Sequence, residues 1–136
     1  MNYVVIDTNV IVSALLAENR NKSVPFSILQ AVFEGKITPV LSEPIMAEYT
    51  EVLAREKFGF NQGLVFTLLS ELRKQAVFIH PPKTDKALPD SKDVCFYEAA
   101  MVYENIGVFL VTGNMKHFPD CRFALTPAML KEKLGL

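Results

Sequence analysis

Three carboxylates stand beside or within apolar patterns of the chain: Asp7, Glu48 and Asp93. Asp7 directly follows the apolar run Tyr3–Ile6. Glu48 lies flush with the edge of the apolar face of a predicted helix, three residues after Ile45. Asp93 has apolar residues three, four, seven and eight positions after it, so it projects from the middle of a buried helical stripe. An ionised carboxylate in such a place needs a partner that offsets its lost hydration.

Oxygen ligands without a cluster of His or Cys are the set that Mg²⁺ or Mn²⁺ prefers. One or two such ions activate water, neutralise a scissile phosphate and stabilise the leaving oxygen. The chain has no glycine-rich phosphate loop of either common type, so a nucleoside triphosphate is not the obvious substrate. The pattern therefore favours hydrolysis of a phosphodiester.

Ordinary structural roles remain open for several of these polar residues. Asp7 also suits the N-cap of the helix that follows it. Glu48 also suits a salt bridge with a basic neighbour, and Asp90 has a good local role as the N-cap before Asp93. Asn114 follows the apolar strand 108–112 and can offer its carbonyl oxygen to a cation, but a plain turn explains it as well.

The elements that must position these residues alternate between strand and helix. We expect strands at 3–6, 37–41, 76–79, 108–112 and 123–126, and helices at 10–16, 23–35, 42–55, 64–75, 90–105 and 127–134. This alternation predicts an α/β fold with a mostly parallel sheet and right-handed crossovers. Asp7 then lies at the carboxyl end of a central strand, where open α/β sheets bind their ligands.

Composition favours one domain over residues 1–136, with half of the residues apolar and no low-complexity segment. No apolar run approaches the roughly 18 residues of a membrane span, and no signal peptide is apparent, so we expect a cytoplasmic protein. Cys95 and Cys121 fit idle thiols in a reducing compartment. The net charge of −1 counts against a strongly basic nucleic-acid binder, unless several of the acids hold cations.

Four segments together resemble the successive motifs of PIN domains: residues 4–10, 41–48, 90–100 and 110–118. The resemblance is closest to the bacterial and archaeal VapC-like PIN proteins classed as toxins of type II toxin–antitoxin pairs. It covers essentially the whole chain. It implies a metal-dependent endoribonuclease with a three-layer α/β/α sandwich, and one or two Mg²⁺ or Mn²⁺ ions as cofactor.

Carried over residue by residue, the family acids fall on Asp7, Glu48 and Asp93, with Asp90 beside the third. The fourth family position is usually Asp in a Thr-x-Asp turn, whereas this chain has Asn114. A neutral amide lowers the ligand charge and should weaken a second cation. Either one cation suffices, or Asn114 only orients a water, or Asp120 compensates.

Other polar residues match supporting positions of the family. Thr8 and Asn9 correspond to residues that orient the first acid or a water, and Thr112 to a phosphate contact. Lys116 and His117 are candidates for contacts with the nucleic-acid backbone. Arg20 and Lys22 are further candidates, although ordinary solvated surface explains each of these basic residues equally well.

The family also implies partners: RNA, a cognate antitoxin laid over the site, and a second copy of the chain in a homodimer or higher oligomer. The apolar third and fourth helices, with Phe58, Phe60 and Phe66, are candidate surfaces for such contacts. One alternative is an inactive PIN-like module that binds RNA or a protein, which Asn114 and the near-neutral charge motivate. A receiver-type phosphoacceptor domain ranks last, because no Asp ends a mid-chain strand.

Overall fold

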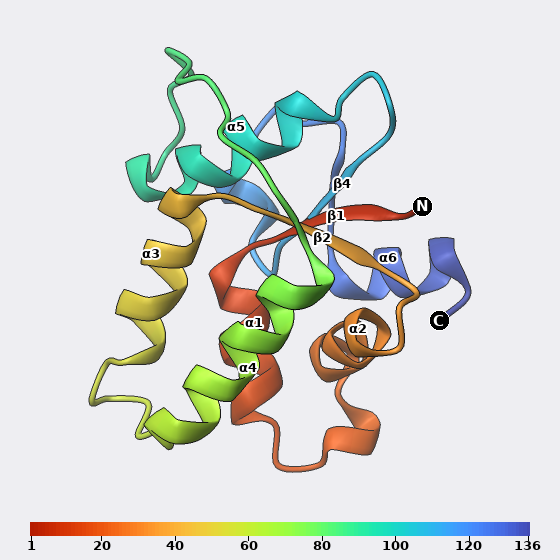
Figure 1. The fold of residues 1–136 in the computed structure, drawn as a ribbon. Helices are drawn as coiled ribbons and strands as arrows, with labels where there is room; N and C mark the ends of the chain where they lie inside the picture. The colour runs from red at the N-terminus through yellow and green to blue at the C-terminus, as the bar shows by residue number, and fades with distance from the viewer.

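A computed structural model describes all 136 residues, and its centre is a five-stranded parallel sheet in the order β3-β2-β1-β4-β5 (Figure 1). The strands are β1 (Tyr3–Ile6), β2 (Thr38–Leu41), β3 (Val77–Phe78), β4 (Phe109–Val111) and β5 (Ala124–Leu125). Every neighbouring pair is parallel, with Val4 opposite Pro39 on one side and Phe109 on the other. The strand that ends at Asp7 is therefore the central one, as the sequence predicts.

Helices cover both faces of this sheet. They are α1 (Thr8–Leu16), α2 (Val24–Phe33), α3 (Glu43–Leu53), α4 (Gln62–Gln75), α5 (Val94–Val102) and α6 (Pro127–Leu134), with short 3-10 turns η1 (Arg20–Lys22), η2 (Ser91–Asp93) and η3 (Met115–His117). In Figure 1, α5 lies on one side of the strands, and α1, α2, α4 and α6 lie on the other. The fold is thus the three-layer α/β/α sandwich that the family resemblance implies. No helix is long and apolar enough to cross a membrane.

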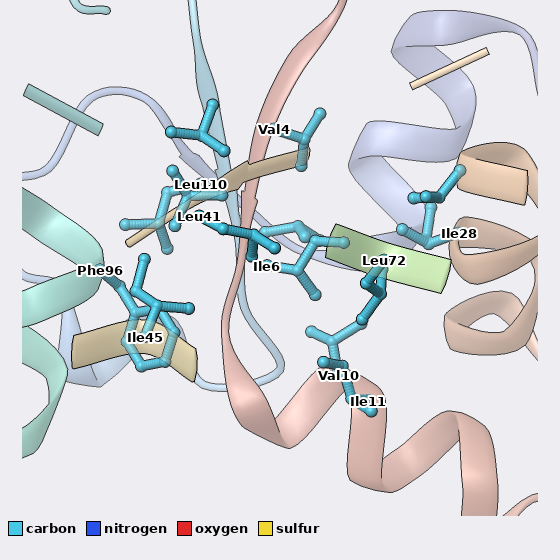
Figure 2. Packing of buried hydrophobic residues seen from close by; sticks show 14 of the residues in the cluster. Val4, Ile6, Val10, Ile11, Ile28, Leu41, Ile45, Leu72, Phe96 and Leu110 are labelled. Carbon is cyan, nitrogen blue, oxygen red and sulfur yellow. The ribbon is translucent and has the colours of Figure 1, made fainter. Parts of the chain in front are cut away.

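The core lies on both faces of β1, whose residues Val4–Ile6 are fully buried. Figure 2 shows Ile28 and Leu72 packed on one side of the strands, and Ile45 and Phe96 on the other. A strand buried on both faces reads as a continuous apolar run, which is why its position was predictable from sequence.

Capping residues set where the helices begin. The Oγ of Ser42 accepts a hydrogen bond from the N–H of Ile45 at 3.3 Å, and the Oγ of Ser23 accepts one from Phe26 at 3.1 Å. Thr126 caps α6 in the same way. These bonds satisfy amide groups that the first turn of a helix leaves without partners.

Local boundaries differ from the sequence prediction in places. The first helix begins at Thr8, because tertiary packing of Val10 and Ile11 in the core outweighs their weak helix propensity. The third helix ends at Leu53, about one half-turn early. The helix expected over 90–105 starts as the tighter turn η2 and ends at Val102.

One further difference concerns which side chains are buried. The sequence pattern places Leu64, Leu68, Leu69 and Leu72 on one apolar stripe of the fourth helix, whereas the structure buries Val65, Leu69 and Leu72 and leaves Leu64 68% exposed. Pro39 is the second residue of β2, an early position in an internal strand. Its missing N–H is tolerated because the pairing of β2 with β3 begins only at the next residue, Val40.

Candidate functional site

A cavity of about 260 Å³ opens at the carboxyl edge of β1, and it contains all three predicted acids. Its lining comes from α1, α3, the segment after α3, η2 and η3. The lining residues are Asp7, Thr8, Asn9, Val12, Ser13, Glu48, Val52, Phe58, Asp93 and His117. Residues far apart in the sequence thus meet in one hollow, as expected where parallel strands end.

Asp7 is held rigidly at the base of this cavity and is only 3% exposed. Its backbone N–H donates to the carbonyl of Val111 at 2.9 Å, which continues the pairing of β1 with β4. The Oγ1 of Thr112 donates to Oδ2 of Asp7 at 2.7 Å. Although Asp7 stands at the N-cap position of α1, its side chain makes no capping hydrogen bond. The carboxylate of Asp7 is therefore positioned by Thr112, which follows β4, and does not cap helix α1.

The turn after β4 is tied to α1 by a second set of contacts. The N–H of Gly113 donates to Oδ1 of Asn9 at 2.9 Å, and the N–H of Asn114 donates to Oγ1 of Thr112 at 3.0 Å. A Cβ at position 113 would stand 3.3 Å from Oδ1 of Asn9, so glycine allows this close approach. Asn9 and Thr112 therefore brace the scaffold around Asp7.

Asp93 is 7% exposed and enters the cavity from the end of η2. Its Oδ2 lies 3.0 Å from Nδ1 of His117, but the two are not aligned as a hydrogen bond, and this buried oxygen has no other partner. Asp90 instead accepts a hydrogen bond from the N–H of Lys92 at 3.0 Å and so caps the turn. Of this pair, Asp93 is the one that faces the cavity.

Glu48 is the most exposed of the three acids and reaches the cavity from the middle of α3. It forms no ion pair, whereas Glu51 on the same helix pairs with Arg55 at 2.8 Å. The salt bridge that offered an alternative role for Glu48 is therefore absent.

The electrostatics show how closely the acids interact. Burial raises the pKa of Asp7, although the hydrogen bond from Thr112 opposes the rise. Burial, followed by the charge of Asp7, raises the pKa of Asp93 to about 6. Burial also raises the pKa of Glu48, while Lys92 and Arg55 nearby favour its ionised form. The charge of His117 lowers the pKa of Asp7 and of Asp93, but burial outweighs it, so the pKa of both aspartates stays raised.

The donor set fits a hard divalent cation. Two buried side-chain oxygens have no hydrogen-bond partner, Oδ2 of Asp93 and Oγ1 of Thr8, and both residues line the cavity. As placed, no three His, Cys, Asp or Glu side chains converge tightly enough to hold one ion together. Mg²⁺ does not require such a cage, because it commonly keeps several waters and binds through one or two carboxylates.

Several residues expected at the site lie elsewhere. Asn114 and Lys116 are not among the lining residues, and Asp120 occupies a left-handed turn (φ 61°) outside the cavity. Arg20 lies over the ring of Phe26, 5.4 Å from its centroid, and does not reach the cavity. Lys22 does not line it either.

Conversely, the cavity contains side chains that the sequence reasoning did not assign to it: Val12, Ser13, Val52 and Phe58. Phe58 was expected only as a partner-binding surface. The sequence contains one feature that could have pointed to Phe58. In Lys57-Phe-Gly-Phe60, a lysine and two aromatic residues follow the end of the predicted third helix.

Comparison with known proteins agrees with this architecture. The family model for the PIN domain matches residues 3–116. The uncharacterized protein MJ1680 of Methanocaldococcus jannaschii is 32% identical over 114 residues, which cover 82% of this chain and 70% of that protein. The chain therefore belongs to the PIN domain family, whose members generally are nucleases that use divalent metals.

Proposed function

We propose that this protein is a Mg²⁺- or Mn²⁺-dependent endoribonuclease whose active site is the cavity of Asp7, Glu48 and Asp93. The observation that carries the proposal is the burial of two mutually repelling aspartates, one of which has an oxygen without a hydrogen-bond partner. Burying carboxylates in this way destabilises the fold unless a cation compensates them. Membership of a nuclease family supplies the reaction class.

In this proposal Asp7 and Asp93 hold the cation, and Glu48 completes the site from α3. When bound, the ion supplies a Lewis acid that acidifies water and neutralises charge on the phosphodiester. Thr112 fixes Oδ2 of Asp7 through its 2.7 Å hydrogen bond. His117, whose Nδ1 lies 3.0 Å from Oδ2 of Asp93, is placed to orient that carboxylate. No side-chain nucleophile is required.

We further propose that the protein is the toxin of a toxin–antitoxin pair, acting on cytoplasmic RNA and inhibited by a cognate antitoxin. The motif resemblance supports this assignment. An apolar groove of about 490 Å³ between α3 and α4, where Phe66 is 75% exposed, offers a surface for the antitoxin or for a second copy of the chain. The oligomeric form we propose is a homodimer or higher.

A second candidate function is a PIN-like module that binds RNA or protein without cleaving it. The specific observation in its favour is Asn114, which replaces the usual acid and lies outside the cavity lining. This candidate predicts RNA binding without metal-dependent cleavage.

The test is cleavage of a mixed single-stranded RNA during titration with Mn²⁺ and Mg²⁺. Cleavage by the wild-type protein should depend on the metal and should be lost in Asp7→Asn and Asp93→Asn. Asp120→Asn is the matched control, because Asn tolerates the left-handed backbone at that position. It should retain full activity. Cleavage that survives both active-site substitutions would refute the assignment, and binding without cleavage would favour the second candidate.

A further inference from the structure

Phe58 is an aromatic side chain that lines the catalytic cavity without belonging to the hydrophobic core. It lies in the segment between α3 and α4 and is partly buried. Its neighbour Phe60 packs against the core, whereas Phe58 stacks on Phe60. Phe58 therefore presents apolar surface to the acidic cavity.

The immediate surroundings of the ring resemble a stacking platform. Phe60 stacks with Phe58 at a centroid distance of 5.4 Å and an interplanar angle of 12°, which fixes the plane of the pair. The Nζ of Lys57 lies 5.0 Å from the centroid of the Phe58 ring. Lys57 is exposed and has no carboxylate within ion-pair distance, so its ammonium group is free to move to an incoming anion.

The cavity as a whole combines two chemistries. Val12, Val52 and Phe58 supply apolar lining, while Asp7, Glu48 and Asp93 supply the oxygens. At about 260 Å³ it is smaller than typical small-molecule pockets of roughly 300–1,000 Å³, so most of a polymeric substrate must lie across its rim. A nucleotide combines two matching parts, because its aromatic base suits the apolar lining and its phosphate suits a cation held by the carboxylates.

We propose that Phe58 stacks on an unpaired nucleobase next to the scissile phosphate, and that Lys57 binds a neighbouring phosphate. The inference rests on the proposed nuclease function and names two residues of this chain that position its RNA substrate. In an RNA duplex the bases are stacked on each other and cannot reach a protein ring, whereas unpaired bases stack readily on aromatic side chains. Phe58 is then a determinant of strand selectivity rather than a member of the metal site.

The first test compares cleavage kinetics of Phe58→Ala with those of the wild type on a single-stranded RNA. The matched control is Phe33→Ala, an equally large and more exposed ring at the end of α2, outside both the cavity and the groove. Stacking predicts that Phe58→Ala raises KM by roughly tenfold. Phe33→Ala should leave KM unchanged. Equal kinetics for wild type and Phe58→Ala would overturn the inference while leaving the nuclease assignment intact.

A binding experiment separates the inference from the reaction. The chain contains no tryptophan, so Phe58→Trp introduces a single indole fluorophore at the platform. In the cleavage-silenced Asp93→Asn background, a saturating single-stranded oligonucleotide should quench this fluorescence, and a duplex of the same sequence should not. Phe33→Trp in the same background should respond to neither. Anisotropy of a labelled oligonucleotide measures binding independently.

Each outcome decides the question. Quenching at position 58 alone supports stacking even if no cleavage condition is found, so failure of the proposed function is recognisable separately. RNA binding without quenching at position 58, or equal quenching at both positions, would overturn the inference. Absence of any oligonucleotide binding would overturn it as well.

Discussion

Helix α3 borders two hollows of opposite character. On one side Glu48 and Val52 face the acidic cavity, and on the other Met46 and Thr50 face the apolar groove shared with α4. The first hollow buries two carboxylates, one of which has an oxygen without a hydrogen-bond partner, and the second exposes apolar surface to water. Each arrangement departs from what stability alone favours, but a buried charge costs far more than an exposed ring. This contrast is the reason why we propose the acidic cavity, and not the groove, as the site of the chemistry.

The largest expected effect is on catalysis at the acidic cavity. Asp7→Asn removes a charge that the cation requires, so the rate of metal-dependent RNA cleavage should fall by about a thousandfold or more. Phe66→Ala in the groove should leave the rate unchanged. Initial rates of RNA cleavage at saturating Mn²⁺ measure the effect of each substitution. Comparable losses of rate in the two variants would contradict the assignment of catalysis to the acidic cavity alone.

A smaller effect is expected from the residue that positions Asp7. Thr112→Val keeps the shape of the side chain but removes its 2.7 Å hydrogen bond to Oδ2 of Asp7. Metal affinity should weaken by about 10- to 100-fold, as is typical for partners that orient a ligand. Thr112→Ser, which retains the hydroxyl, should restore most of the affinity. Calorimetry measures the Kd of the metal for each variant. An unchanged Kd in Thr112→Val would contradict the role of Thr112 in positioning Asp7.

The acidic cavity should also show a conflict between function and stability. Asp93→Asn removes a buried carboxylate whose pKa is raised. The free energy of unfolding of the metal-free variant should therefore be about 1–2 kcal/mol larger than that of the wild type at pH 7. Denaturant unfolding in the presence of a chelator measures this difference. A marked loss of stability would mean that the Asp93 charge holds the fold together instead.

The same raised pKa predicts a pH dependence. Asp93 has a folded-state pKa of about 6, above its unfolded value of roughly 3.9, so the native state binds more protons between these values. Its contribution to stability is therefore fully present below about pH 4 and is lost as the pH rises to about 6. The test is to measure the free energy of unfolding of the wild type and of Asp93→Asn across this pH range without metal. The value for the wild type minus the value for the variant should decline as the pH rises. A flat difference would show that the two states titrate alike.

The smallest effect is expected in the apolar groove. Phe66→Ser replaces a ring that is 75% exposed, so the free energy of unfolding of the isolated chain should change by less than about 0.5 kcal/mol. Thermal unfolding measures it. A large destabilisation would mean that the groove is part of the folded core.

Local patterns in the sequence were sufficient for much of this account. The continuous apolar run of β1 and the serines that cap α2 and α3, Ser23 and Ser42, located their elements, because each signal depends on neighbours along the chain. The position of Asp93 within an apolar stripe predicted its burial correctly, and Asp7 lies where it was expected, at the carboxyl end of the central strand. Their roles as metal ligands stay a prediction.

Features that depend on tertiary contacts were not predictable in the same way. The burial of Val65 in place of Leu64 depends on how α4 is rotated against α2 and β2, which one apolar stripe does not specify. Phe58 reaches the cavity because the segment after α3 turns back toward α1, and no periodic pattern encodes such a turn. Asn114 matches its motif in sequence, yet its place outside the cavity lining became visible only in three dimensions.

The most direct test of the central claim is a calorimetric titration of the metal-free protein with Mn²⁺. The buried carboxylates predict saturable binding to the wild type, at least tenfold weaker binding to Asp93→Asn, and unchanged binding to Asp120→Asn. Equal binding to all three proteins, or none to the wild type, would contradict the assignment of this cavity as a metal-dependent active site.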